Sequence, residues 1–257
     1  FKLYIKHFIT IYTFKYKIRI MKNTRGYFFY KNFNFLYRLY LLYVKHKTFL
    51  PKKTYSMWGE DLFVEKYFKK VAKGFYVDVG AYHPYFWSNT QLLFKKNWEG
   101  INIDVNPASI EIFNDARPKD YNINAAVSNK NKKYIKYYTK NIINTMSTTI
   151  VGSAKTAFLK GSFDVRKAKC YKLDEIISKT KFKDRRIDFL NIDTEKSEID
   201  VLKSLNFKKY KPKLICIEIH AKNEKKIKHH KTYLFLKRKK YKLIWNVGFS
   251  FIFKTKF

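Results

Sequence analysis

The stretch of residues 74–104 constrains the fold of this chain more than any other part of its sequence. Residues 75–79 form a β-rich apolar run that contains one acid and ends at Gly80-Ala81, where small residues allow a tight turn. A short helical pattern follows, and a second apolar run then stops at an acid, Asp104. This order of strand, small-residue turn, helix, strand and acid predicts a nucleotide-type βαβ unit.

The turn and the final acid of this unit have a specific chemical use. Small residues at the carboxyl end of the first strand let the backbone approach a ligand, and Asp104 can accept hydrogen bonds from both hydroxyls of a ribose. The GxGxxG pattern of dinucleotide-binding proteins is absent, and only Asp78-x-Gly80 is present. A ligand with a ribose end and an amino-acid end therefore fits better than a pyrophosphate, and S-adenosylmethionine is such a ligand.

Eight segments of the chain, in order over residues 55–253, carry a family resemblance. They are WGEDLFVEKYF at 58–68, GFYVDVGAYHP at 74–84, SNT at 88–90, GINIDVNP at 100–107, NAAVS at 124–128, NTMS at 144–147, IDFLNIDTEKSEIDVL at 187–202 and KLICIEIH at 213–220. Together they resemble the FkbM-type methyltransferases. The resemblance implies an α/β fold of the Rossmann-like class I methyltransferase type, with a mostly parallel seven-stranded sheet, an antiparallel C-terminal hairpin strand and helices on both faces.

The cofactor-binding residues are predicted from the βαβ unit and from the resemblance. The family places the equivalent of Glu60 near the cofactor, whereas a solvated acidic start of a helix is the alternative. Residues 88–90 can cap the helix after the turn. Ala126, in a predicted third strand at 121–127, could line a flat adenine ring or serve plain packing. The predicted set is Glu60, Asp78, Gly80, Ala81, Asn89, Thr90, Asp104 and Ala126.

The catalytic candidates follow from the chemistry of methyl transfer. The reaction is an in-line displacement at a methyl carbon, and a hydroxyl acceptor also needs a general base. Asp193 and Glu195 rank first because they match the family motif Asp-x-Glu-Gly at the end of a buried strand. Lys196 stands where the family has Gly, and the lysine could pair with one of the acids. His220, which ends the next strand, could orient the acceptor or lie at the surface.

Residues 129–170 are the least periodic part of the chain and are predicted to be a loop-rich wall that binds the acceptor. The candidate contacts in this wall are Asn144, Thr145 and Ser147.

The two catalytic acids are close enough in sequence to share a divalent metal, but nothing in the spacing demands one. The two cysteines also lack any ligand spacing. No metal is therefore predicted.

Residues 1–54 are aromatic and basic, and we expect them to be an extension of one methyltransferase domain at 55–257. Their most apolar piece, at 35–44, is too short to cross a bilayer, which takes about 18 apolar residues or more. One interpretation is a helix packed on the domain, a second is a peripheral contact with an anionic membrane, and a third is a disordered or mistranslated leader. No signal peptide is recognised, so the expected location is cytoplasmic, with peripheral attachment at the inner membrane surface as the alternative.

The charge of the chain bears on its partner. Fifty-five basic and 20 acidic residues give a net charge of +35, which favours nucleic acid or an anionic membrane. The abundance of residues with AT-rich codons explains the same excess of lysine without any partner. From the resemblance alone, we expect O-methylation of a sugar hydroxyl in a glycan or glycolipid. The alternatives are a nucleic-acid methyltransferase and a non-catalytic basic binding protein on a degenerate methyltransferase core.

Overall fold

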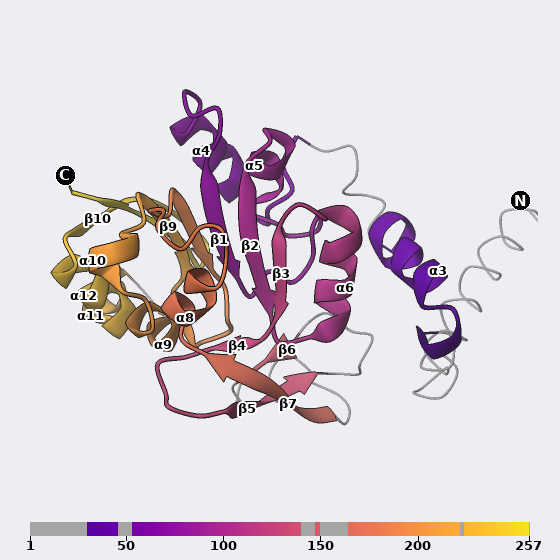
Figure 1. Cartoon of the computed structure of the whole chain (residues 1–257). Helices are drawn as coiled ribbons and strands as arrows, with labels where there is room; N and C mark the ends of the chain where they lie inside the picture. The colour runs from indigo at the N-terminus through magenta and orange to yellow at the C-terminus, as the bar shows by residue number, and fades with distance from the viewer. Residues whose placement is uncertain (1–29, 46–52, 140–146, 150–163, 222–223, 257) are drawn as a thin grey trace, which may run out of the picture.

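A seven-stranded sheet forms the centre of the molecule (Figure 1). The computed structural model describes residues 30–45, 53–139, 147–149, 164–221 and 224–256. The strand order is β10-β11-β9-β8-β1-β2-β3. The five strands from β9 to β3 are parallel, and β11 runs antiparallel to both β9 and β10. Their bounds are β1 Phe75–Val79, β2 Glu99–Asp104, β3 Tyr121–Asn124, β8 Phe189–Ile192, β9 Leu214–Glu218, β10 Tyr241–Val247 and β11 Ser250–Thr255.

Helices cover both faces of this sheet. One face packs against α4 (Glu60–Tyr67) and α5 (Gln91–Lys95), and α6 (Pro107–Ala116) contacts β2 and β3. The other face packs against α8, α9, α10 and α12. The bounds of these helices and of the neighbouring α11 are α8 Leu173–Ser178, α9 Glu198–Lys203, α10 Phe207–Tyr210, α11 Glu224–His229 and α12 Lys231–Arg238. The mixed α/β architecture expected from the sequence is present.

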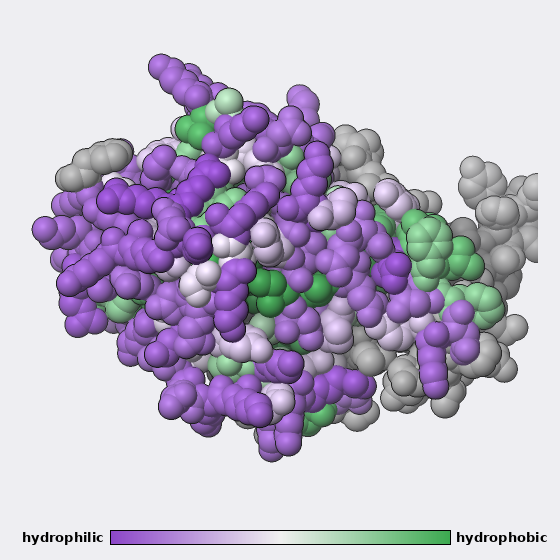
Figure 2. Space-filling view, viewed as in Figure 1, coloured by the Kyte–Doolittle hydropathy of each residue, from purple (hydrophilic) through white to green (hydrophobic). Residues whose placement is uncertain are grey.

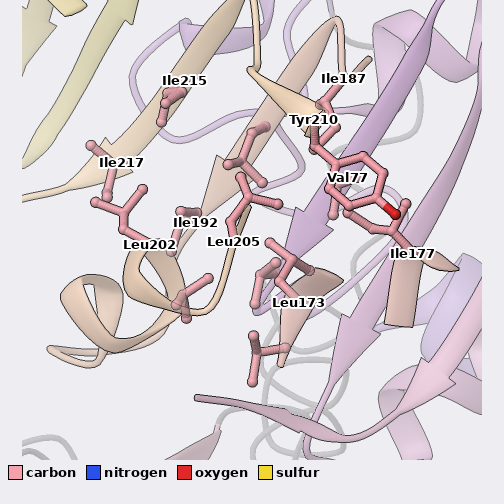
Figure 3. Close-up of a cluster of buried hydrophobic side chains, with 14 of the residues drawn as sticks. Val77, Leu173, Ile177, Ile187, Ile192, Leu202, Leu205, Tyr210, Ile215 and Ile217 are labelled. Carbon is pink, nitrogen blue, oxygen red and sulfur yellow. The ribbon is translucent and has the colours of Figure 1, made fainter. Parts of the chain in front are cut away.

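The largest core cluster shows how strand alternation builds the layers (Figure 3). Successive side chains of a strand point to opposite faces. Val77 and Val79 of β1 therefore join Leu173 and Leu202 in one cluster, whereas Tyr76 belongs to the cluster on the other face. Full burial of each such aliphatic side chain contributes about 1.5–3 kcal/mol. The core thus holds the carboxyl ends of the strands in fixed positions.

The region predicted to be loop-rich contains a second sheet, with the strand order β4-β7-β5-β6. Its strands are β4 Ala126–Val127, β5 Tyr134–Thr139, β6 Ser147–Thr148 and β7 Asp164–Tyr171. The prediction missed these strands because the alternation in β7 is broken at its start, where the apolar Val165 faces solvent and the charged Arg166 is half-buried. The third strand predicted at 121–127 is present but divided, since β3 ends at Asn124 and residues 126–127 form β4, which pairs with β7 in the second sheet.

One predicted helix start is confirmed, and two other helix predictions need correction. The start of α6 is as predicted, because the Asn106 side chain accepts a hydrogen bond from the Ala108 amide at 3.0 Å. In contrast, no side chain caps α5, because the Thr90 hydroxyl is used elsewhere. The basic helix predicted at 223–240 is divided into α11 and α12, and His230 caps the second of these.

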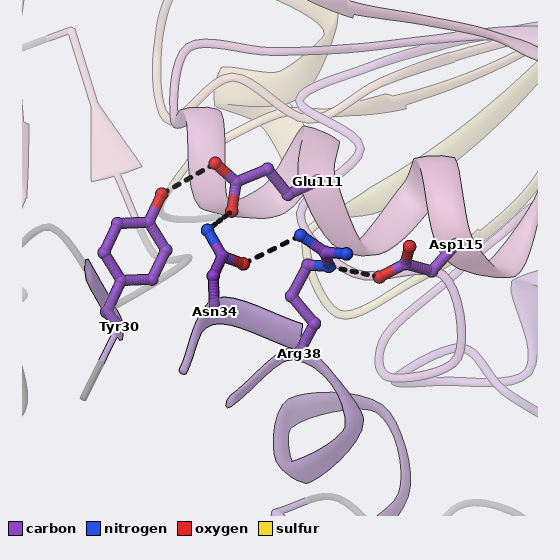
Figure 4. A network of polar contacts seen from close by, with 5 residues as sticks. All are labelled: Tyr30, Asn34, Arg38, Glu111 and Asp115. Carbon is purple, nitrogen blue, oxygen red and sulfur yellow. Dashed lines mark hydrogen bonds and ion pairs between the residues drawn. The ribbon is translucent and has the colours of Figure 1, made fainter. Parts of the chain in front are cut away.

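A helical segment before residue 54 packs on α6 (Figure 4). It consists of α3 (Asn34–Leu39) and the π-helical turn η1 (Tyr40–Val44). Leu41 and Leu42 are buried against Ile112, and Arg38 forms an ion pair with Asp115 at 2.5 Å. The interpretation as a packed helix therefore fits, while the domain boundary after residue 54 stays a prediction. Among the described residues, no helix has the length and apolarity needed to span a membrane.

Candidate cofactor and acceptor site

A cleft opens at the carboxyl ends of β1, β2, β8 and β9, which is the edge where parallel sheets of this kind bind ligands. Most of the predicted site residues line it. They are Glu60, Asp78, Gly80, Ala81, Asn89, Asp104, Ala126, Ser147, Asp193 and Glu195. Thr90 and His220 are not among the lining residues, and Asn144 and Thr145 lie outside the residues that the structure describes.

Gly80 makes the turn at the end of β1 possible. Its φ of +80° is a left-handed conformation that favours glycine. The amides of Gly80 and Ala81 both donate to the Ile103 carbonyl, at 2.9 and 3.1 Å. A Cβ added at Gly80 would lie 1.7 Å from the backbone oxygen of Asp193. The turn therefore closes against both neighbouring strand ends, and only glycine fits there.

Asp104 lies at the end of β2 and organises the backbone around it. One carboxylate oxygen accepts from the Tyr82 amide at 2.9 Å, and the other accepts from the Asn106 amide at 2.8 Å. Burial raises the pKa of Asp104 to about 7, while these two hydrogen bonds oppose that rise. Each oxygen keeps a further lone pair, and hydroxyls of a ribose could donate to them.

A row of polar side chains crosses the sheet beneath the cleft. Asp78 of β1 accepts from Asn191 of β8 at 2.8 Å and from the Thr90 hydroxyl at 2.7 Å. Asn191 in turn accepts from Asn89 at 2.9 Å. Burial raises the pKa of Asp78, and the hydrogen bonds from Asn191 and Thr90 oppose that rise. Thr90 is thus a fully buried support of Asp78 that lies behind the cleft.

Sequence reasoning missed Arg117, which holds the loop that follows Gly80. Its side chain is fully buried, and its guanidinium lies over the ring of Phe113. Hydrogen bonds from this group reach the Pro84 carbonyl and the side chains of Tyr76, Ser88, Thr90, Gln91 and Asn102. Nothing local in the sequence marks a lone arginine after a helix as a core residue, because its partners come from four other segments.

Glu60 is buried, with 2% of its surface exposed. Its carboxylate accepts from the Trp58 amide at 2.8 Å and from the Ser250 hydroxyl at 2.6 Å. The solvated helix start considered for Glu60 is therefore wrong. The residue instead ties the start of α4 to β11 at the edge of the cleft.

Four titratable groups lie together at the ends of β8 and β9: Asp193, Glu195, Glu218 and His220. Burial and the nearby Glu218 carboxylate raise the pKa of both Asp193 and Glu195. The Asp193 side chain is exposed, but protein atoms surround it closely enough to limit its hydration, and this raises its pKa. The Glu218 carboxylate, whose Oε2 lies 2.8 Å from Nε2 of His220, raises the pKa of the imidazole. Glu218 was not among the predicted site residues, although it ends a buried strand.

The turn that presents Glu195 has an unusual backbone. Glu195 and Lys196 both have positive φ, at +53° and +82°. The second value lies where a glycine is favoured, which matches the glycine of the family motif at this position. The described ion pairs do not include Lys196, so the suggested pairing with an acid is not seen.

Exposed aromatic side chains surround the mouth of the cleft. Trp58, Trp87 and Phe249 line it with 52%, 38% and 50% of their surfaces exposed. Exposed aromatic surface is costly unless a ligand covers it. Large rings of this kind give a binding site broad contact area.

The mostly parallel sheet with a ligand cleft at its strand ends is compatible with a Rossmann-like methyltransferase. Residues 78–243 match the family model of the methyltransferase FkbM domain, which is more than half of the 257-residue chain. The chain belongs to the FkbM methyltransferase family, and methyl transfer is its general activity. No curated protein matches the chain. The matched residues include every predicted site residue except Glu60.

Proposed function

We propose that this protein transfers a methyl group from S-adenosylmethionine to a hydroxyl of a sugar in a glycan or glycolipid. The observation that supports this best is one cleft in which a ribose-type carboxylate, Asp104, and the general-base candidates Asp193 and Glu195 share the lining. The aromatic mouth of the same cleft supports the acceptor class.

The residues around Gly80 fit S-adenosylmethionine. A glycine turn without room for a Cβ brings backbone close to the cleft, and Asp104 has lone pairs left for the ribose hydroxyls. Ala126 offers a flat, small surface for the adenine. When bound, the cofactor supplies an electrophilic methyl group on its sulfonium.

Asp193 and Glu195 would accept the proton of the acceptor hydroxyl. Neither carboxylate accepts a hydrogen bond from any described residue, so both are free to turn toward an acceptor. Burial and the nearby Glu218 carboxylate raise their pKa values, which makes each carboxylate a stronger base. Proton acceptance by a placed base contributes about 10²–10⁴-fold to a rate.

The lining of the cleft favours a sugar over a nucleic acid. The C–H groups of a sugar face carry partial positive charge and pack well on aromatic rings such as those of Trp58 and Phe249. The carboxylates of Asp193, Glu195 and Glu218 line the same cleft and would repel the phosphates of RNA or DNA. The charged side chains that line the cleft are therefore acidic, in contrast to the net charge of +35 of the whole chain.

The test is a transfer assay beside calorimetric binding of S-adenosylhomocysteine. Glu195→Gln and Asp193→Asn are each expected to slow transfer about 10²–10⁴-fold. Both variants should keep cofactor affinity, and Glu65→Gln, on the surface of α4, is the matched control. Oligosaccharides and RNA are offered as competing acceptors. Full activity in both variants would remove the acids from catalysis, and preferential methylation of RNA would overturn the acceptor class.

We also propose that α3 and η1 contact an anionic membrane surface. Six of the exposed large hydrophobic residues lie on this one segment: Phe33, Phe35, Leu36, Tyr40, Tyr43 and Val44. Figure 2 shows hydrophobic side chains at the side of the molecule where α3 lies, while hydrophilic side chains cover most of that view. The net charge of +35 complements anionic lipid.

Sedimentation with vesicles tests this attachment. Binding is expected to vesicles that contain phosphatidylglycerol and to be much weaker with phosphatidylcholine alone. The double variant Phe35→Glu, Leu36→Glu should abolish it. Leu62→Glu, which charges an exposed leucine on α4, should not. Equal sedimentation of both variants would show that α3 is not the contact.

A further inference from the structure

Three side chains at the ends of β8 and β9, two of which line the cleft, have the arrangement of a metal-binding set. Glu195 follows β8, and Glu218 and His220 lie at the end of the adjacent β9. One carboxylate oxygen of each glutamate and one ring nitrogen of the histidine all lie within 4.8 Å of one another. The parallel pairing of β8 with β9 brings these groups together, because the two strands end at the same edge.

The distances agree with coordination of a single ion. Oxygen and nitrogen ligands lie about 2.0–2.2 Å from small divalent cations, so two adjacent octahedral ligands are about 3 Å apart. The separation between Nε2 of His220 and Oε2 of Glu218 is 2.8 Å. Two carboxylates with one imidazole are ligands that suit Mn²⁺ and similar first-row ions. Only a small movement of Glu195 would complete three contacts.

The same atoms are otherwise unsatisfied. Oε2 of Glu218 and Nε2 of His220 are shielded from solvent, and their mutual contact does not have the geometry of a hydrogen bond. Buried polar atoms without partners are rare and call for an explanation. The neighbouring Glu198 differs, because its carboxylate accepts from the Thr194 and Lys196 amides at 3.3 and 2.8 Å. Among the carboxylates and the imidazole at this end of the cleft, the buried atoms without a hydrogen-bond partner therefore belong to the proposed ligands Glu218 and His220.

We propose that Glu195, Glu218 and His220 bind one divalent cation of the Mn²⁺ type at the acceptor end of the cleft. The role of this ion rests on the proposed function, whereas its binding does not. An acceptor hydroxyl bound to the ion would lose its proton more readily. With the ion bound, Glu195 would serve as a ligand and Asp193 alone would receive that proton, while the hydroxyl oxygen forms its bond to the methyl carbon and the bond from that carbon to sulfur breaks.

The site is tested by titrating the full-length, chelator-treated protein with Mn²⁺. Binding is measured as the loss of the paramagnetic resonance signal of the free ion. His220→Ala and Glu218→Gln are expected to weaken Mn²⁺ binding at least about tenfold. Asp193→Asn should bind Mn²⁺ like the wild type. Matched controls are His230→Ala, which removes a histidine from the cap of α12, and Glu65→Gln. Binding of S-adenosylhomocysteine is measured in every variant and is expected to stay unchanged.

The outcomes separate the two proposals. Equally weak Mn²⁺ binding by the wild type, His220→Ala and Glu218→Gln would overturn the metal site, even where the cofactor binds. Binding of Mn²⁺ that is lost in both variants would establish the site, even where the cofactor fails to bind and the proposed function falls. Loss of Mn²⁺ binding in the His230→Ala control as well would overturn the assignment to these three residues.

Discussion

The two halves of the cleft differ in how completely their polar groups are satisfied. At the ends of β1 and β2, Asp78 and Asp104 each accept two hydrogen bonds and are buried. At the ends of β8 and β9, the carboxylates of Asp193 and Glu195 accept none from the described residues, and Glu218 has its 2.8 Å contact with His220. The proposed cofactor half is therefore organised by hydrogen bonds within the protein, whereas the proposed acceptor half has carboxylates with few protein partners.

This difference has a physical meaning for catalysis. A rigid, hydrogen-bonded half fixes the position of a bound ligand, which saves entropy when the reaction begins. Groups that change their protonation or coordination during a reaction cannot be fully engaged in the resting protein.

The largest effect is expected from Gly80→Ala in the cofactor half. The new Cβ would meet the Asp193 carbonyl, and the positive φ would strain any side chain. Together these should lower the free energy of unfolding by about 2–5 kcal/mol. Urea denaturation measures the change. Gly59→Ala is the control, because Gly59 has a φ of +87° but a Cβ added there would come no closer than 4.0 Å to a neighbouring atom. A similar small loss in both variants would show that the turn at Gly80 is adaptable.

The next effect is a pH dependence of cofactor binding through Asp104. The pKa of about 7 means that this carboxyl is protonated below neutral pH in the folded protein. The protonated form accepts ribose hydroxyls poorly, so affinity for S-adenosylhomocysteine should rise as the pH increases toward 7 and level off above it. One titrating group gives a change of up to about tenfold per pH unit below the pKa. Calorimetry measures it.

Asp104→Asn is the control for this pH dependence. The amide keeps the shape and cannot ionise, so its affinity should be lower and nearly constant between pH 5 and 8. If the affinity of the Asp104→Asn variant for S-adenosylhomocysteine depends on pH as steeply as that of the wild type, a group other than Asp104 is responsible for the pH dependence.

The smallest effect concerns the strained turn of the acceptor half. Lys196→Gly places glycine at a φ of +82° and should raise the free energy of unfolding by up to about 1 kcal/mol. Lys196→Ala removes the same charge but keeps the strain, so it should bring no gain. Thermal denaturation of both variants measures the difference. Equal stability of the two would mean that the turn at Lys196 is relaxed.

Much of the site was predictable because its signals are local. Small residues at Gly80-Ala81 and acids at strand ends, such as Asp104 and Asp193, mark a cleft in any parallel sheet. The start of α6 was predictable from Asn106 and the proline after it. Placement of Thr90 was not, because a hydroxyl at a helix start has several partners within reach, and burial of Asp78 decided among them.

What the sequence determined by itself is therefore the set of strands, turns and acids that a βαβ protein needs, because side-chain alternation and turn chemistry act over a few residues. The tertiary structure decided the pairing of β4 with β7, the burial of Arg117 and the meeting of Glu195 with Glu218 and His220. Each of these depends on strand register and on crossovers that join distant parts of the chain. Such contacts form only when the whole core packs, so no short stretch of sequence encodes them.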